Sequence, residues 1–177
     1  LFTFLLQHSA EFAEDVVANW VTAVPASAPL LLTSGTAEYV LGWALARCEQ
    51  EQPLPVRTSA IGLLGTMWMY FAPSMAPSAG AHPVSAAVGK AFKQAVAPES
   101  ALALRITAVS YLVETVDRFE SNNREFTPAS MALLVHCVTQ SGGYETEQVR
   151  QHAVAGLVGA LYAHPTLSVD SLLESLA

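Results

Sequence analysis

The 177-residue sequence predicts an all-α fold, an α-α superhelix (α-solenoid) of about four to five stacked helix pairs. A nine-residue pattern occurs three times at near-constant spacing, and a helix-like segment precedes each copy. Hydrophobic residues make up 52% of the chain and charged residues 13%, against a usual charged share of about 25%. Because so few charges cannot solvate many exposed faces, we expect most helices to be covered by neighbours.

The repeated pattern is an apolar residue, Arg, two variable residues, Ala, Ile or Val, two variable residues and Leu. Its copies read VRTSAIGLL from position 56, LRITAVSYL from position 104 and VRQHAVAGL from position 149. The arginines, Arg57, Arg105 and Arg150, are 48 and 45 residues apart. We expect each arginine to reach an acidic side chain or loop carbonyls in the adjacent helix pair.

The apolar positions of the pattern fall on one side of a helix, as the period of 3.6 residues requires. A small residue lies within that apolar side in every copy, where it allows a neighbouring helix to approach closely. These residues are Ala60, Ala108 and Ala153. The pattern therefore predicts three long helices that pack against one another.

A helix is predicted before each copy of the pattern, over Thr36–Cys48, Pro83–Val96 and Pro128–Gln140. Pro83 suits a helix start, Thr127 is the expected N-cap of the third segment, and Gly142 with Gly143 is its expected stop. A further helix is predicted over Ala10–Val24 and another from about Ser168. The predicted pairs span residues 1–27, 36–72, 83–121, 127–163 and, in part, 166–177. We interpret residues 1–177 as one solenoid segment of a longer polypeptide.

The pattern resembles the second helix of HEAT repeats, and its spacing is close to the period of about 40 to 47 residues in HEAT and armadillo units. The resemblance covers roughly residues 36–163. It implies a non-catalytic scaffold that presents a curved surface to protein partners, in the cytoplasm or the nucleus. A helical regulatory region of a larger enzyme, such as a kinase, is an alternative.

Residues 56–75 more specifically resemble a helix in the TOG domains of microtubule polymerases. TOG domains bind acidic tubulin through the turns within their helix pairs, using a Trp in one turn and Lys or Arg in later ones. The corresponding segments here, 48–55, 96–100 and 140–147, contain no base and no Trp. A divergent TOG-like tubulin-binding domain is therefore an alternative that like-charge repulsion disfavours.

The same three segments contain five glutamates, which we call the acidic edge: Glu49, Glu51, Glu99, Glu145 and Glu147. If the turns align along one side of the stack, these carboxylates can bind a protein partner with a basic surface. The alternative is that charged turns serve only solubility.

The charge balance argues against other partners. The net charge is −7, and the eight Lys and Arg residues are scattered, so that no basic patch is available for nucleic acid or for an anionic membrane surface. Thr58–Ala76 is uncharged and about long enough to span a bilayer, but it contains Pro73 and several small or polar residues. We expect a buried helix there.

No catalytic, metal or cofactor site is predicted. The five histidines show no metal-ligand spacing: His8, His82, His136, His152 and His164. No nucleophile elbow or phosphate-binding glycine loop occurs. Cys48 and Cys137 lie in apolar helical segments and are expected to be free, buried thiols.

Overall fold

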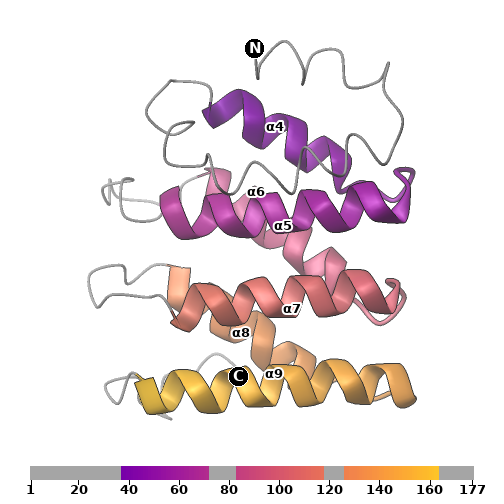
Figure 1. Ribbon diagram of the computed structural model, residues 1–177, viewed down its shortest axis with the longest axis vertical. Helices are drawn as coiled ribbons and strands as arrows, with labels where there is room; N and C mark the ends of the chain where they lie inside the picture. Colours follow the sequence, from indigo (N-terminus) through magenta and orange to yellow (C-terminus); the bar gives the residue numbers. More distant parts are fainter. Residues whose placement is uncertain (1–36, 72–82, 118–125, 164–177) are drawn as a thin grey trace.

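The computed structural model describes residues 37–71, 83–117 and 126–163. Within these ranges the secondary structure is helical and contains no strand, which confirms the all-α class for this part of the chain. The helices are α4 (Ala37–Arg47), α5 (Leu54–Phe71), α6 (Pro83–Ala95), α7 (Leu102–Asp117), α8 (Phe126–Thr139) and α9 (Tyr144–Ala163) (Figure 1). The helices predicted over Ala10–Val24 and from Ser168, and thus the pairs 1–27 and 166–177, lie outside the described residues.

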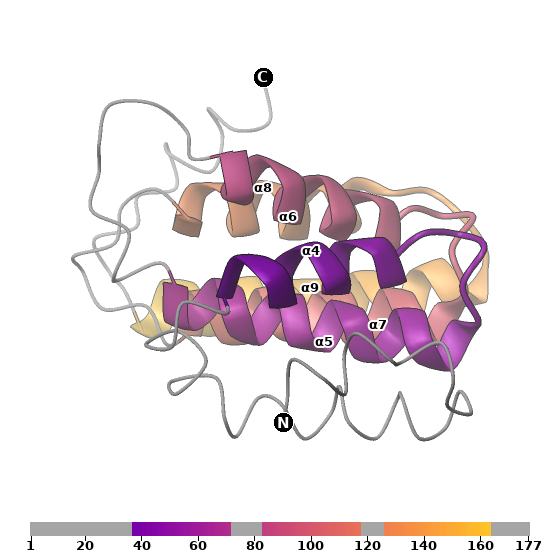
Figure 2. The same ribbon diagram turned by 90° about the horizontal axis from the view of Figure 1, so that it is seen from above.

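The long helices α5, α7 and α9 lie side by side in one layer (Figures 1 and 2). Helices α6 and α8 form a second layer on one side of it, and α4 packs on α5 and α6. Each long helix contacts the helix that precedes it, and α7 also contacts the long helices on both sides of it, α5 and α9. Most helices are therefore covered on more than one side, as the low share of charged residues requires.

One hydrophobic cluster runs through the described helices from Val40 in α4 to Ala160 in α9. Ala60, Ala108 and Ala153 are all fully buried, and Ala108 and Ala153 belong to this cluster. Burial of these small side chains agrees with their predicted place between closely packed helices.

Two glycines set the spacing of the long helices. A Cβ atom on Gly65 of α5 would lie 2.7 Å from the Cβ of Tyr111 in α7. A Cβ atom on Gly156 of α9 would lie 2.1 Å from a methyl carbon of Val113, also in α7. Carbon atoms not bonded to each other normally stay about 3.5 to 4.0 Å apart, so neither approach is available to a larger residue.

The helix before each pattern copy is close to its predicted range, but the turn after α8 differs from the prediction. Helix α8 begins at Phe126, so Thr127 lies inside its first turn and is not an N-cap. Helix α8 ends at Thr139, and Gly142 and Gly143 instead precede α9 directly. The Gly143 carbonyl accepts a hydrogen bond of 3.1 Å from the Glu147 N–H, which places this glycine at the start of α9.

None of the described helices is both long enough and apolar enough to cross a membrane. The uncharged run predicted as a buried helix is described as far as Phe71, within α5. Ile61, Leu63 and Leu64 of this helix are buried in the shared core. Packing against other helices therefore accounts for the lack of charge in the described part of the run.

Candidate functional site

The three turns that join α4 to α5, α6 to α7 and α8 to α9 lie at one edge of the molecule (Figures 1 and 2). Four carboxylates of the acidic edge have exposed side chains: Glu49, Glu51, Glu99 and Glu145. No ion pair of these four occurs within residues 37–71, 83–117 and 126–163. The structure therefore brings the three predicted turns to one edge.

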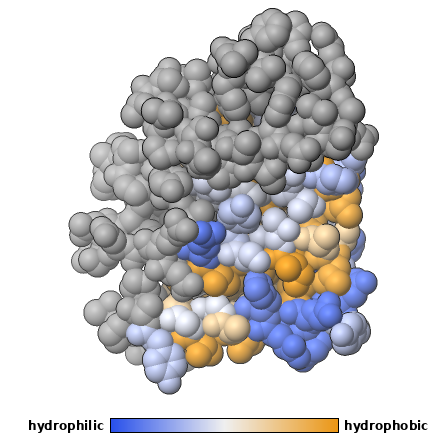
Figure 3. Space-filling model, in the orientation of Figure 1, coloured by the Kyte–Doolittle hydropathy of each residue, from blue (hydrophilic) through white to orange (hydrophobic). Residues whose placement is uncertain are grey.

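Glu145 and Glu147 were predicted to lie in a turn, but α9 begins at Tyr144 and includes both residues. They occupy the first turn of that helix, where a negative charge interacts favourably with the unpaired backbone N–H groups. In Figure 3 the hydrophilic surface at this edge is concentrated at the lower right, where α9 begins. The acidic edge thus includes a helix start as well as turns.

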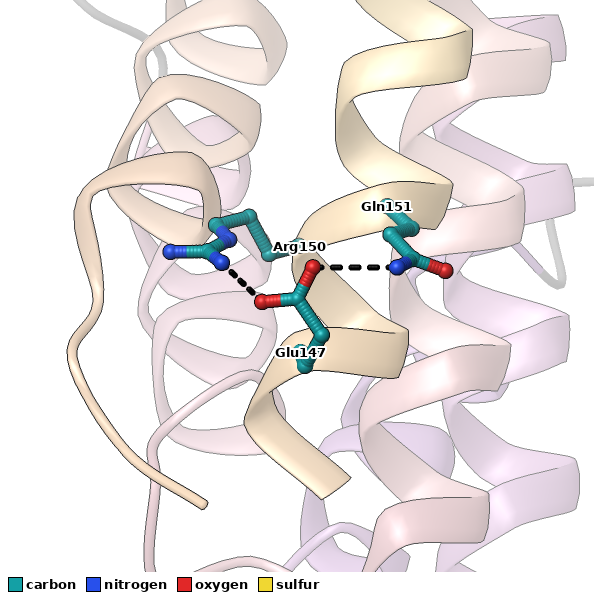
Figure 4. Close-up of polar contacts among 3 residues, drawn as sticks. All are labelled: Glu147, Arg150 and Gln151. Atoms are coloured by element: carbon teal, nitrogen blue, oxygen red, sulfur yellow. Dashed lines mark hydrogen bonds and ion pairs between the residues drawn. The ribbon is translucent and has the colours of Figure 1, made fainter. Parts of the chain in front are cut away.

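Glu147 differs from the other four because both of its oxygens have partners (Figure 4). One oxygen forms an ion pair with the guanidinium of Arg150. The other accepts a hydrogen bond of 3.0 Å from the Gln151 amide. These partners lie three and four residues further along the same helix, a spacing that places them on one side. Arg150 therefore offsets the charge that Glu147 would add to the edge.

The edge also carries cations that were not predicted there, because they belong to helices and not to turns. Arg47 lies in the last turn of α4, with its guanidinium 5.3 Å from the centre of the Trp43 ring. Lys93 lies in the last turn of α6 and is exposed. Cations are favoured at helix C-termini, which is a sequence signal that could have found both. The edge is therefore less acidic than predicted.

Arg105 is 1% exposed and links two successive turns. Its Nη2 donates a hydrogen bond of 2.9 Å to the side-chain oxygen of Gln140, which follows α8. Both Nη atoms also contact the Thr146 hydroxyl of α9, at 3.4 and 3.3 Å. The Gln140 amide in turn donates a hydrogen bond of 3.1 Å to the Val96 carbonyl, which precedes α7. We call these four residues the Arg105 network.

The Arg105 network confirms that this arginine reaches the next helix pair, but the predicted partner type was wrong. Arg105 bonds to an amide oxygen and a hydroxyl, and not to an acid or to a loop carbonyl. Its Nε has no hydrogen-bond partner among the described residues. A buried cation held by neutral groups carries a desolvation cost, so its partners must stay in place.

The other two pattern arginines behave differently. Arg57 is half-buried, and its Nε has no partner within the described ranges. Arg150 is 44% exposed and pairs with Glu147 in its own helix, so it does not reach an adjacent helix pair as predicted. Arg57 and Arg105 are each the fourth residue of their helix, whereas Arg150 is the seventh. Helix α9 has more residues before its pattern arginine than α5 and α7 do, and one of these residues is the Glu147 that pairs with Arg150.

Both cysteines are free thiols, as predicted, but only Cys137 is fully buried as expected, and Cys48 is partly exposed. Burial raises the pKa of the Cys48 thiol from 9.0 to about 12, although the Arg57 guanidinium lowers it in part. Burial likewise raises the pKa of Cys137 from 9.0 to about 11, against a lowering effect of Arg105. Because the thiolate is the reactive form, neither side chain is suited to nucleophilic chemistry at neutral pH.

A contact between Ser110 and His152 was not predicted. The Ser110 hydroxyl oxygen lies 3.0 Å from the Nε2 of His152, across the packing of α7 on α9. The Ile106 carbonyl, also 3.0 Å from this oxygen, competes with the imidazole for the hydroxyl proton. Within the described residues, no group of three or more His, Cys, Asp or Glu could hold a metal ion.

Comparisons of the chain with family models, with curated proteins and with solved structures found no match.

Proposed function

We propose that this chain is a non-catalytic protein–protein interaction scaffold, built of HEAT-like repeats that stack into an α-solenoid. The observation that carries the proposal is the Arg105 network, in which Val96, Gln140 and Thr146 join the turn before α7 to the turn before α9. A buried link of this kind holds neighbouring turns at a fixed spacing. In repeat proteins such contacts between neighbours give an extended binding surface.

The partner that fits this edge is a basic peptide segment or a positively charged protein surface. Glu49, Glu51, Glu99 and Glu145 are exposed carboxylates on a chain of net charge −7. Carboxylates along one edge create a negative potential that attracts cations and orients them on approach. Glu147 contributes little to this attraction because its carboxylate already forms an ion pair with Arg150.

The test is a charge-reversal series with a synthetic Lys- and Arg-rich peptide as the probe. Fluorescence anisotropy measures its affinity for the unmodified chain and for the variant with Glu49, Glu51, Glu99 and Glu145 all changed to Lys. We expect the variant to lose binding by at least about tenfold, and we expect binding by the unmodified chain to weaken as salt rises above about 0.15 M.

The matched control is Glu147→Gln, which removes a carboxylate that is already paired. We expect the affinity of this control to stay within about twofold of the unmodified chain, because the Glu147 carboxylate is already paired with Arg150 and adds little attraction for the peptide. Equal affinity of the charge-reversed variant and the unmodified chain would show that the four exposed carboxylates serve solubility only.

A further inference from the structure

An exposed aromatic ring lies at the acidic edge, beside one of its carboxylates. Tyr144 is the first residue of α9 and is 78% exposed, and the exposed Glu145 follows it. Aromatic side chains stabilise a fold mainly by being buried, so a ring open to solvent contributes little to this one. Tyrosine is also enriched among the residues that dominate the binding energy of protein interfaces. The position of Tyr144 therefore suits contact with a partner better than packing within the chain.

The chain around Tyr144 leaves the approach to the ring open. Residues 141–145 are all exposed. Gly142 and Gly143 precede the tyrosine and carry no side chain, and a Cβ atom on Gly143 would meet no atom within 4 Å. The hydrogen bond from the Glu147 N–H to the Gly143 carbonyl holds this segment at the start of α9. A group from a partner can therefore reach the ring at a defined place on the edge.

The charges near Tyr144 favour a cation as that group. Glu145 forms no ion pair in the described part of the chain. The nearest Lys or Arg in the sequence is Arg150, which is already paired with Glu147. The face of an aromatic ring is electrostatically negative and attracts cations, as a carboxylate does. The ring and the carboxylate beside it therefore attract the same kind of partner group.

A contact of this kind already exists elsewhere at the edge. The Arg47 guanidinium lies 5.3 Å from the centre of the Trp43 ring, in the last turn of α4. Trp43 is buried and its ring is used within the chain. The Tyr144 ring, in contrast, is open to a guanidinium from outside.

We propose that Tyr144 selects arginine over lysine in the basic partner of the acidic edge, by stacking on the arginine guanidinium beside Glu145. The inference rests on the proposed function, because it names the basic residue that the edge prefers. Arginine and lysine both pair with carboxylates. The planar, weakly hydrated guanidinium also stacks on an aromatic ring, whereas the ammonium of lysine is compact and strongly hydrated.

Two peptides of equal length and charge test the proposal, one with arginine and the other with lysine at every basic position. Fluorescence anisotropy measures the affinity of each for the unmodified chain, for Tyr144→Ala and for Tyr144→Phe. We expect the unmodified chain to prefer the arginine peptide. Tyr144→Ala should weaken binding of the arginine peptide by about two- to fivefold and of the lysine peptide by less. Tyr144→Phe keeps the ring and should keep the preference.

Tyr162→Ala is the matched control, because Tyr162 is 87% exposed near the opposite end of the same helix. We expect it to leave both affinities unchanged. Circular dichroism should show the same helix content in Tyr144→Ala, Tyr162→Ala and the unmodified chain, since neither ring is buried.

Three results would overturn the proposal while leaving the proposed function in place. The first is an unchanged ratio of the two peptide affinities in Tyr144→Ala, which would assign any arginine preference to the carboxylates, since these can accept paired hydrogen bonds from a guanidinium. The second is an equal loss in Tyr162→Ala. The third is loss of the preference in Tyr144→Phe. Failure of both peptides to bind the unmodified chain would overturn the proposed function, and this inference with it.

Discussion

Arg105 and Gln140, 35 positions apart in the sequence, form a buried hydrogen bond of 2.9 Å between the start of α7 and the residue after α8. This bond places a cation where no described carboxylate balances it. The stability of the helix stack should therefore depend on Arg105 far more than on the other arginines of the pattern.

Replacement of Arg105 by Met tests this dependence. Met approximates the volume of the aliphatic chain but leaves the Gln140 oxygen and the Thr146 hydroxyl without their donor. We expect unfolding by urea to show a loss of about 1 to 3 kcal/mol, the usual cost of a buried polar group left unsatisfied. Arg150→Met removes an exposed arginine from the same pattern position and should cost less than about 1 kcal/mol. Equal losses in the two variants would contradict the assignment.

Gly142 should tolerate no side chain, because Thr146, which accepts hydrogen bonds from Arg105, lies directly beside it. A Cβ atom there would lie 2.5 Å from the hydroxyl oxygen of Thr146, an acceptor of the Arg105 network. We expect Gly142→Ala to lower the melting temperature, whereas Gly143→Ala, which meets no atom within 4 Å, should change it by much less. Thermal unfolding followed by circular dichroism makes the comparison.

The packing of α9 on α7 can be tested at Gly156. An alanine there would force a methyl group into Val113, so we expect Gly156→Ala to destabilise the fold by about 1 to 3 kcal/mol. Gly42→Ala places the same methyl group in α4, where nothing lies within 4 Å, and should stabilise the helix by about 0.5 to 1 kcal/mol. A stabilising effect at Gly156 would show that the two helices are not so closely packed.

The stability of the fold should depend on pH through the buried Cys137 thiol. The pKa of Cys137 is raised from 9.0 to about 11, so the folded chain holds this proton more tightly than the unfolded chain does. Its contribution to stability is therefore complete below pH 9 and is lost as the pH rises through about 11. Iodoacetamide at pH 8 should label Cys137 slowly in the folded chain and rapidly in urea. Equal labelling rates would mean that the thiol is accessible and ionised as in an unfolded peptide.

The tubulin-binding alternative makes a separate prediction. Exposed glutamates lie at all three turns or at the helix start beside them, and they repel the acidic surface of tubulin. We therefore expect that the chain does not co-sediment with microtubules at physiological salt. The variant with Glu49, Glu51, Glu99 and Glu145 changed to Lys supplies the opposite charge and serves as the comparison. Retention of the unmodified chain would favour the TOG-like alternative over a scaffold with a basic partner.

The helices were predictable because their signal is local. The period of apolar residues and the position of Pro83 depend only on neighbouring residues, and α6 begins at that proline. The double glycine was assigned to the wrong helix because a glycine between two helices suits the end of one as well as the start of the next. The close approach of Gly142 to Thr146 decides between them, and this is a tertiary contact.

The polar contacts were less predictable than the helices. Gln140 carries no charge and belongs to no motif, so nothing in the sequence marks it as the partner of Arg105. The pairing of Glu147 with Arg150 depends on α9 starting before the pattern, and helix starts are uncertain by several residues in sequence-based assignment. Lys93 was not assigned to the edge because it belongs to helix α6 and not to a turn.

A double-mutant cycle on Arg105 and Gln140 tests the central claim most directly, because the scaffold proposal requires neighbouring helix pairs to be held together at their turns. The urea-derived free energies of unfolding of Arg105→Met, Gln140→Leu and the double variant give the coupling energy. We predict a coupling of about 1 to 3 kcal/mol, the range expected for a buried hydrogen bond to a charged group. Additive losses, with a coupling near zero, would contradict the claim that this bond joins successive helix pairs.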